Sequence, residues 1–432
     1  MKTLQSWGRL TKQPHDVLAL TPATAGAGLP ITAQPAIPFG MGRSYGDTAL
    51  NAGGPVWTTS GLDSFLQFDA KTGVLVCEPG VLLRDIQRCG VAQGWMLPVT
   101  PGTQMATVGG AIANDVHGKN HHVFGTFGEH VLQIKLLRTD GTSITCSPQQ
   151  NVEYFSATVG GIGLTGVIIE ATLQLRKVTG SWLETETIPY GNVDEFFKLS
   201  RESESDWEYT VSWIDCLAGH GGRGLFMRAN HSDRTQGPLP KARVRSFPIV
   251  PPISVVNKLS LRAFNNAYFY LNRAKRGRRL EHYQPFFYPL DNLQHWNRMY
   301  GPKGFYQYQS VIPGRYASTA TQAMLDAIAR SGQGSFLAVL KTFARRPEVG
   351  MLSFPREGAT LALDFPNLGA ETDKLFQRLD AIVLEAGGRI YLGKDARMPR
   401  AVFEAGYPRL VEFLSYRDPG ISSEMSRRLM GS

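Results

Sequence analysis

Short runs of β-branched and other apolar residues, separated by Gly-rich turns, recur along the chain. Such runs are typical of β-strands. They predict strands over residues 75–81, 131–139, 166–178, 304–313 and 360–366. Other segments place apolar residues three and four positions apart, which is typical of amphipathic helices. They predict helices over residues 82–94, 193–205, 316–332 and 372–388, most of them ending in or just before glycine.

Length and composition fit a large packed protein. The chain has 432 residues, of which 42% are hydrophobic and 19% charged, so we expect more than one core. No apolar run reaches the ~18 residues of a spanning helix, and residues 1–16 lack the apolar stretch of a secretory signal. The four cysteines are spaced like neither a disulfide framework nor a zinc site, which predicts free thiols in a reducing compartment: Cys77, Cys89, Cys146 and Cys216.

Positive charge is concentrated in one segment. Residues 223–279 contain thirteen Lys or Arg and one acidic residue. This segment therefore carries more positive charge than the net +9 of the whole chain. Its cations alternate with apolar and aromatic residues, so we interpret it as a basic, apolar insert in an otherwise near-neutral protein.

Two glycine-rich stretches, residues 38–54 and 101–131, place glycine beside small hydroxyl residues. Backbone of this kind can turn several N–H groups toward one point and bind an anion, so the pair suits a pyrophosphate. A dinucleotide fingerprint, Gly161-x-Gly163-x-x-Gly166, also occurs, but a strand pattern follows it where a Rossmann fold requires a helix. We therefore expect a phosphate-bearing cofactor outside a Rossmann fold.

Motifs in these two stretches carry a specific resemblance. PFGMGRSYGD (38–47) and TVGGAIANDVHGKNHH (107–122) are similar to the flavin-binding loops of the vanillyl-alcohol oxidase superfamily, which has a PCMH-type FAD-binding domain. SWGR (6–9), LDFP (363–366) and KDAR (394–397) extend the match over nearly the whole chain. Within that superfamily, the chain resembles the decaprenylphosphoryl-β-D-ribose 2′-oxidase family.

The resemblance implies an α+β fold with two lobes. One lobe is a PCMH-type FAD-binding domain, and the other is a substrate-binding domain built on an antiparallel sheet with helices. The expected boundaries are 1–178 for the main FAD-binding part, 179–389 for the substrate-binding domain and 390–432 for a C-terminal return to the FAD-binding domain. The basic and apolar insert spans about residues 223–300 of the second domain.

Family residues that contact the cofactor can be carried over to this chain. The resemblance implies that FAD is bound by Gly40, Gly42, Arg43, Ser44, Tyr45, Gly46, Asp47, Gly102, Thr103, Thr107, Gly109, Gly110, Ala111, Asn114, His117, Lys119, Val167 and Tyr391. Many relatives join the flavin covalently to a His in the first loop. Arg43 takes that place here, so we expect FAD to be bound without a covalent bond.

The same resemblance implies the reacting groups. Lys394 matches the family's active-site lysine; His117 is a second candidate for the base, and Tyr45 would relay or orient. Residues implied on the substrate side are Gln307, Gln309, Lys341, Phe343 and Trp213. We expect no metal, because the glycines around His117, His121 and His122 disfavour the helix that would present them together.

The implied reaction is FAD-dependent oxidation of the 2′-hydroxyl of a polyprenyl-phosphoryl-β-D-ribose to the 2-keto sugar. This step is the first half of an epimerisation toward an arabinose donor for cell-wall biogenesis, and an NAD(P)H-dependent ketoreductase would complete it. Because the substrate's tail lies in a bilayer, the basic insert would contact an anionic membrane surface. We therefore expect a cytoplasmic protein, peripheral at the inner membrane face.

Two other functions stay open from the residues alone. A soluble alditol or aldonolactone oxidase of the same superfamily would use the same cofactor but not the insert. A non-enzymatic protein that binds membranes or nucleic acid would use the insert but leave the glycine-rich stretches and Lys394 unexplained. No nucleic-acid fold signature accompanies the basic insert, so we expect no nucleic-acid partner; a solvated loop is the simplest alternative for it.

Overall fold

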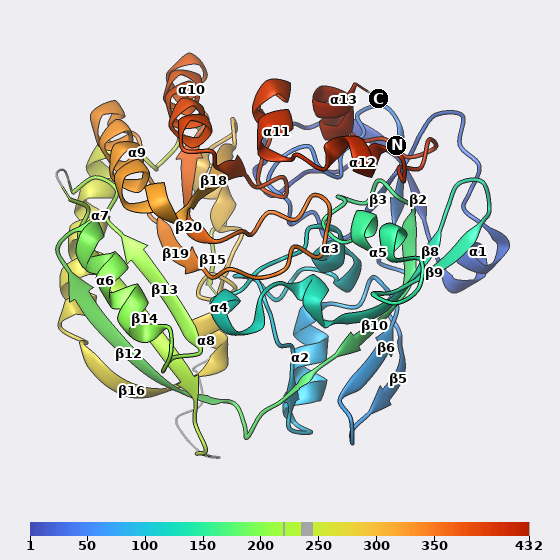
Figure 1. Ribbon diagram of the computed structural model, residues 1–432. Coiled ribbons are helices and arrows are strands. Elements are labelled where there is room, and N and C mark those ends of the chain that lie inside the picture. Colours follow the sequence, from blue (N-terminus) through green and yellow to red (C-terminus); the bar gives the residue numbers. More distant parts are fainter. Residues whose placement is uncertain (219–220, 235–244, 432) are drawn as a thin grey trace.

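The computed structural model describes residues 1–218, 221–234 and 245–431. Three main β-sheets and their covering helices form two lobes, with the N- and C-terminal segments together in one of them (Figure 1). Lys241 and Arg243 of the basic insert lie outside the described residues. No described helix is long and apolar enough to cross a bilayer.

The first lobe contains a four-stranded and a five-stranded sheet. The four-stranded sheet has the order β1 (Lys2–Thr3), β2 (Pro14–Ala19), β4 (Pro55–Thr58), β3 (Ile37–Phe39). The five-stranded antiparallel sheet has the order β5 (Phe65–Asp69), β6 (Val74–Cys77), β10 (Val167–Gln174), β8 (Val131–Leu137), β9 (Ser143–Cys146). Its helices are α1 (Pro22–Ala27), α2 (Leu83–Val91), α3 (Val108–Ala113), α4 (His121–Phe124) and α5 (Val152–Thr158).

The second lobe is built on one eight-stranded antiparallel sheet. Its order is β16 (Gly277–His282), β12 (Trp182–Tyr190), β14 (Gly224–His231), β13 (Tyr209–Ile214), β19 (Val339–Phe343), β20 (Gly358–Pro366), β18 (Phe305–Pro313), β21 (Arg389–Ile390). Its main helices are α6 (Val193–Ser203), α7 (Lys258–Arg273), α8 (Tyr283–Phe287), α9 (Ala317–Ser331) and α10 (Ala370–Glu385).

Alternation along these strands gives the eight-stranded sheet two different faces. Ile214 and Phe226 join the core beneath α6, α9 and α10. Their neighbours Trp213 and Leu225 point the other way and pack with Phe269 of α7. Residues on the face opposite α6, α9 and α10, among them Val211 and Trp213, line a cavity together with residues of the first lobe.

The C-terminal segment returns to the first lobe. Helices α12 (Leu410–Leu414) and α13 (Glu424–Met430) lie beside the N-terminal strands (Figure 1). Helix α11 (Arg400–Gly406) precedes them and contacts β21, α10 and α13. Arg428 of α13 pairs with Asp47 and with Asp395, at 2.9 Å in each case. One guanidinium therefore ties the first glycine-rich stretch to the loop that follows β21.

The pattern of apolar residues predicted these elements well. Each of the predicted strands and helices is present, with ends that differ by a few residues, and antiparallel sheets with helices confirm the α+β class. The main sheets of the first lobe use residues 2–174, and the eight-stranded sheet uses residues 182–390. The domain boundaries at about residues 178 and 390 stay predictions. Of the cysteines, Cys89 is exposed and the other three are buried, and all four are free.

Candidate active site

A large cavity of ≈ 1260 Å³ is lined by residues of both lobes. Both glycine-rich stretches, the inner face of β18–β20 and the loop after β21 contribute to its wall. Pockets for single small ligands usually enclose about 300–1,000 Å³. The cavity therefore has room for a dinucleotide-sized cofactor together with a substrate.

The two glycine-rich stretches meet at the cavity wall. A Cβ added to Gly40 would come within 2.7 Å of the Oγ1 of Thr107, so this close approach requires glycine. Thr107 caps α3 by accepting a hydrogen bond from the N–H of Gly110 at 3.1 Å. On the same wall, the buried Oδ1 of Asn114 and the Nδ1 of His117 have no hydrogen-bond partner among the described residues. Open backbone and unpaired polar atoms fit a cofactor such as FAD, whose phosphates and flavin ring offer matching donors and acceptors.

Most residues that the resemblance implied for the cofactor line this cavity. They are Gly40, Gly42, Arg43, Ser44, Tyr45, Gly102, Thr103, Thr107, Gly109, Gly110, Asn114, His117, Lys119, Val167 and Tyr391. The structure places three others behind the wall. A side chain at Gly46 would overlap the carbonyl oxygen of Asp395, Asp47 pairs with Arg428, and Ala111 is fully buried in the core of the first lobe.

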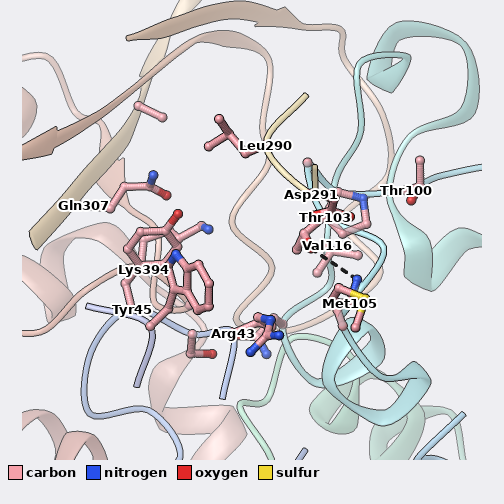
Figure 2. A pocket seen from close by; sticks show the side chains of 18 of the residues that line it. Arg43, Tyr45, Thr100, Thr103, Met105, Val116, Leu290, Asp291, Gln307 and Lys394 are labelled. Atoms are coloured by element: carbon pink, nitrogen blue, oxygen red, sulfur yellow. Dashed lines mark hydrogen bonds between the residues drawn. The ribbon is translucent and has the colours of Figure 1, made fainter. Parts of the chain in front are cut away.

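Lys394, Tyr45 and Gln307 gather on one side of the cavity, across from Thr103 and Asp291 (Figure 2). The ammonium of Lys394 lies 4.0 Å from the centre of the Tyr45 ring. Enclosure away from bulk water lowers the pKa of Lys394 to about 8, although the nearby carboxylate of Asp364 opposes the shift. Both the protonated and the neutral form of Lys394 are therefore populated near neutral pH.

Asp364 on β20 is an acid that the resemblance did not assign. Its Oδ1 accepts a hydrogen bond of 2.6 Å from the side-chain amide of Gln307, which faces it across the β18–β20 pair. Burial raises the pKa of Asp364 to about 7. The signal was present in the sequence, since Asp364 is the one charged residue in the otherwise apolar strand pattern 360–366.

His117 is already engaged by Gln309. The side-chain amide of Gln309 donates to the Nε2 of His117 at 3.0 Å and to the Oγ1 of Thr360 at 3.2 Å. Accepting this bond leaves Nε2 without a proton and puts the proton on Nδ1. Burial, followed by the charge of Lys341, lowers the pKa of His117 well below its ordinary value. His117 is therefore a neutral residue whose basic nitrogen is occupied.

Two further lysines face the same cavity. Lys119 donates to the carbonyl of Phe287 at 2.8 Å, and Lys341 donates to the carbonyl of Gly118 at 3.1 Å. Enclosure lowers the pKa of Lys119 to about 8, and enclosure together with the charges of Lys119 and Lys394 lowers that of Lys341 to about 7. Such crowding of cations favours an anionic ligand.

Of the two remaining residues that the resemblance implied for the substrate side, one lines the cavity and the other does not. Trp213 lines the cavity, and its indole N–H donates to the carbonyl of Phe336 at 3.0 Å. Phe343 does not line it: its ring is buried against His117 and His121, with centroids 5.0 and 4.4 Å apart.

Sequence reasoning also missed Asp291, whose Oδ2 accepts from the N–H of Gln104 at 2.9 Å. Burial raises the pKa of Asp291, which lies near the charges of Arg43 and Lys119. Two arginines of the cavity wall, Arg9 and Arg298, were likewise given no role. Within the described ranges, no group of three or more His, Cys, Asp or Glu could hold a metal ion.

Comparison with known proteins agrees with this geometry. A model of the FAD binding domain matches residues 30–147. The chain is 33% identical to the decaprenylphosphoryl-β-D-ribose oxidase of Mycolicibacterium smegmatis over 99% of this chain and 97% of that protein. It is 31% identical to an uncharacterized protein of Streptomyces coelicolor (78% of this chain, 96% of that protein) and 31% identical to the D-lactate dehydrogenase of Archaeoglobus fulgidus (30% and 32%).

The fold, the cavity and the matched domain define an FAD-dependent oxidoreductase of the vanillyl-alcohol oxidase superfamily. Within this class, the chain belongs to the decaprenylphosphoryl-β-D-ribose oxidase family. The expected family, the PCMH-type FAD-binding fold and FAD as the cofactor are thereby confirmed.

The lowered pKa values of the cavity lysines predict that these residues destabilise the folded protein, and that the destabilisation depends on pH. The pKa of Lys341 is about 7 in the folded protein and 10.5 for a free lysine side chain. The unfolded chain binds more protons between these values, so the penalty is full below pH 7 and fades toward pH 10.5. Lys341→Met should therefore raise the free energy of unfolding of the flavin-free protein by about 2 kcal/mol at pH 7 and by less at pH 9.5. This value is smaller than the full pKa shift would give, because water in the cavity screens the charge.

Urea unfolding of the flavin-free protein at the two pH values measures this difference. Lys374→Met on the exposed side of α10 is the control and should change the free energy of unfolding little at either pH. A gain from Lys341→Met that stays constant with pH, or a loss at pH 7, would contradict the prediction.

Proposed function

We propose that the protein oxidises the 2′-hydroxyl of a polyprenyl-phosphoryl-β-D-ribose to the 2-keto sugar. The single observation that carries the proposal is the group formed by Lys394, Tyr45, Gln307 and Asp364 on one side of the FAD cavity. This group combines a titratable base with fixed hydroxyl-binding amides. The name of the Mycolicibacterium smegmatis relative, which covers nearly the whole chain, supports the substrate class.

Bound FAD supplies the hydride acceptor for the carbinol carbon. Lys394 removes the hydroxyl proton, because its pKa of about 8 leaves a useful fraction of neutral amine near neutral pH. His117 is the weaker candidate, since its Nε2 already accepts a hydrogen bond from Gln309. We therefore assign the base to Lys394.

The other side chains orient the sugar. Gln307 is fixed by Asp364, and Gln309 by His117 and Thr360, so both amides keep a defined direction toward the cavity. Burial raises the pKa of Tyr45 well above its ordinary value, so the phenol stays protonated and serves as a hydrogen-bond donor. Positioning of this kind is the main contribution of a protein to flavin chemistry.

FAD is bound without a covalent bond in this proposal. The guanidinium of Arg43 stacks over Trp7 at 4.8 Å, and its Nη1 donates to the carbonyl of Met41 at 2.8 Å. Arg43 holds no nucleophilic nitrogen at neutral pH, because its guanidinium stays protonated. It therefore acts as a cation beside the cofactor.

The product implies a partner enzyme, and the substrate implies a membrane. A 2-keto sugar becomes the arabinose epimer only after an NAD(P)H-dependent ketoreductase returns a hydride to the opposite face.

Exposed apolar side chains of the insert, among them Ile253 (77%), Leu259 (80%) and Leu271 (64%), lie in the same segment as exposed cations, which suits an anionic bilayer surface at the inner membrane face. A soluble alditol or aldonolactone would leave this surface unexplained, and a non-enzymatic binding protein would leave the lysine-lined FAD cavity unexplained.

Lys394→Ala should retain FAD and lose at least about 100-fold in the rate of flavin reduction, the range typical of losing a general base. The measurement is the bleaching of the flavin absorption band after anaerobic mixing with a polyprenyl-phosphoryl-β-D-ribose. Lys374→Ala, remote from the cavity, should behave like the wild type. Wild-type rates in Lys394→Ala would remove the assigned role.

Charge reversal in the insert should weaken membrane binding. Changing Arg273, Lys275, Arg276 and Arg278 to Glu should reduce partition onto anionic vesicles by about 100-fold or more at low salt, since each surface cation contributes about 1 kcal/mol. Cosedimentation with phosphatidylglycerol vesicles measures the partition. The matched control reverses four exposed cations outside the insert, Arg315, Arg330, Lys374 and Arg378. Equal partition of the insert variant and the wild type would refute a membrane role for the insert.

A further inference from the structure

Two arginines of the cavity wall, Arg9 and Arg298, have no part in the reaction described so far. Arg9 follows strand β1 in the N-terminal segment, and Arg298 lies in the short 3₁₀ helix Trp296–Tyr300. Each is half-buried, and the side-chain amide of Asn297, next to Arg298, donates to the carbonyl of Trp7 at 3.0 Å, which holds the two segments together. Burial, followed by the charge of Arg298, lowers the pKa of Arg9, which agrees with two guanidinium groups close together. Like charges brought together in this way require an explanation.

Neither arginine is neutralised by the protein. No carboxylate of the described residues forms an ion pair with Arg9 or Arg298. The Nη1 of Arg9 is buried and has no hydrogen-bond partner within the described part of the chain. Arg298 uses its Nη1 on two backbone carbonyls, those of Phe247 and Pro248, at 3.2 and 3.0 Å. Leaving a buried guanidinium nitrogen unpaired is unfavourable unless a ligand completes its hydrogen bonds.

The backbone holds Arg9 firmly in this place. Gly8 donates to the carbonyl of Tyr45 at 3.1 Å and accepts from the N–H of Phe305 at 2.8 Å, and a Cβ on Gly8 would come within 2.6 Å of the Phe305 carbonyl. Arg9 itself has φ +56, a left-handed conformation that is uncommon and strained for a non-glycine residue. A strained, tightly packed backbone that presents an unpaired cation to a cavity is typical of a binding site.

We propose that Arg9 and Arg298 together bind the phosphate of the sugar-phosphate substrate. Each guanidinium group has planar pairs of N–H donors, and this geometry suits hydrogen bonds to phosphate oxygens. The inference rests on the proposed function and adds to it the group that recognises the charged part of the substrate.

The position of the pair agrees with the covalent structure of the substrate. In a phosphoryl ribose the phosphate is on C1, directly beside the C2 hydroxyl that is oxidised. The phosphate subsite must therefore adjoin the reacting groups. Gly8, which precedes Arg9, donates to the backbone carbonyl of Tyr45, and the Tyr45 ring contacts the ammonium of Lys394, so the segment that carries Arg9 packs directly against the reacting group.

Three phosphates could in principle reach this pair: that of the sugar substrate, the pyrophosphate of FAD, and a membrane lipid headgroup. The experiment compares Arg9→Gln, Arg298→Gln and the double variant with the wild type, because Gln keeps hydrogen-bond donors and removes the charge. Arg315→Gln, exposed and outside the cavity wall, is the matched control. Each protein is loaded with FAD and mixed anaerobically with a short-chain polyprenyl-phosphoryl-β-D-ribose.

We expect the half-saturating substrate concentration to rise about 10- to 100-fold in each single variant, the effect of losing a hydrogen bond to a charged group. The limiting rate of flavin reduction, the FAD content and vesicle cosedimentation should match the wild type. Arg9→Lys should recover part of the affinity, because it restores the charge without the planar donors.

Other outcomes overturn the inference. An unchanged half-saturating concentration would show that the pair does not bind the substrate phosphate. Loss of FAD would assign the pair to the cofactor, and weaker vesicle binding at unchanged substrate affinity would assign it to a lipid headgroup. If the sugar phosphate does not reduce the wild-type flavin at all, the proposed function fails and the phosphate subsite fails with it. If it reduces the wild-type flavin and the variants have the same half-saturating concentration, only the phosphate subsite is refuted.

Discussion

The constraint on which the site depends is the crowding of positive charge around one cavity. Among the cations that face it are Lys119, Lys341, Lys394 and Arg43. The ammonium groups of the three lysines have lowered pKa values because little water and few carboxylates stabilise their charge. Such a wall is unfavourable when empty and favourable when polyanionic ligands fill it. FAD brings a pyrophosphate, and the proposed substrate brings a further phosphate. The same charge that destabilises the free protein thus selects its ligands.

The fold supplies this arrangement by joining distant parts of the chain. The glycine-rich stretches and strands β18 and β20 all contribute to the cavity wall, and strand alternation turns Gln307 and Gln309 to the same face. Arg428, near the C-terminus, bridges the first stretch and the loop that carries Lys394. Side chains of the cavity from both ends of the sequence are therefore fixed against each other by an ion pair and by backbone packing.

Local patterns were enough to predict the strands, the helices and the two glycine-rich stretches, because each depends on residues close in sequence. The matched motifs implied Lys394 and a set of cofactor residues, most of which line the cavity. The rest depends on contacts through space. Asp364 was missed because its partner Gln307 is on a neighbouring strand. Arg9 and Arg298 were missed because they are far apart in the sequence, and their segments are joined through space by the bond between Asn297 and Trp7. Gly46, Asp47, Ala111 and Phe343 belong to matched segments, yet packing turns them away from the cavity or covers them.

Proton uptake on FAD binding tests the central claim most directly. Calorimetric titration of the flavin-free protein with FAD at pH 8, in buffers of different ionisation enthalpy, gives the number of protons exchanged. An anion placed beside lysines with pKa values of about 7 to 8 raises those pKa values, so the account predicts net proton uptake. No exchange, or proton release, would show that the cavity lysines are not the groups that the cofactor's charge neutralises.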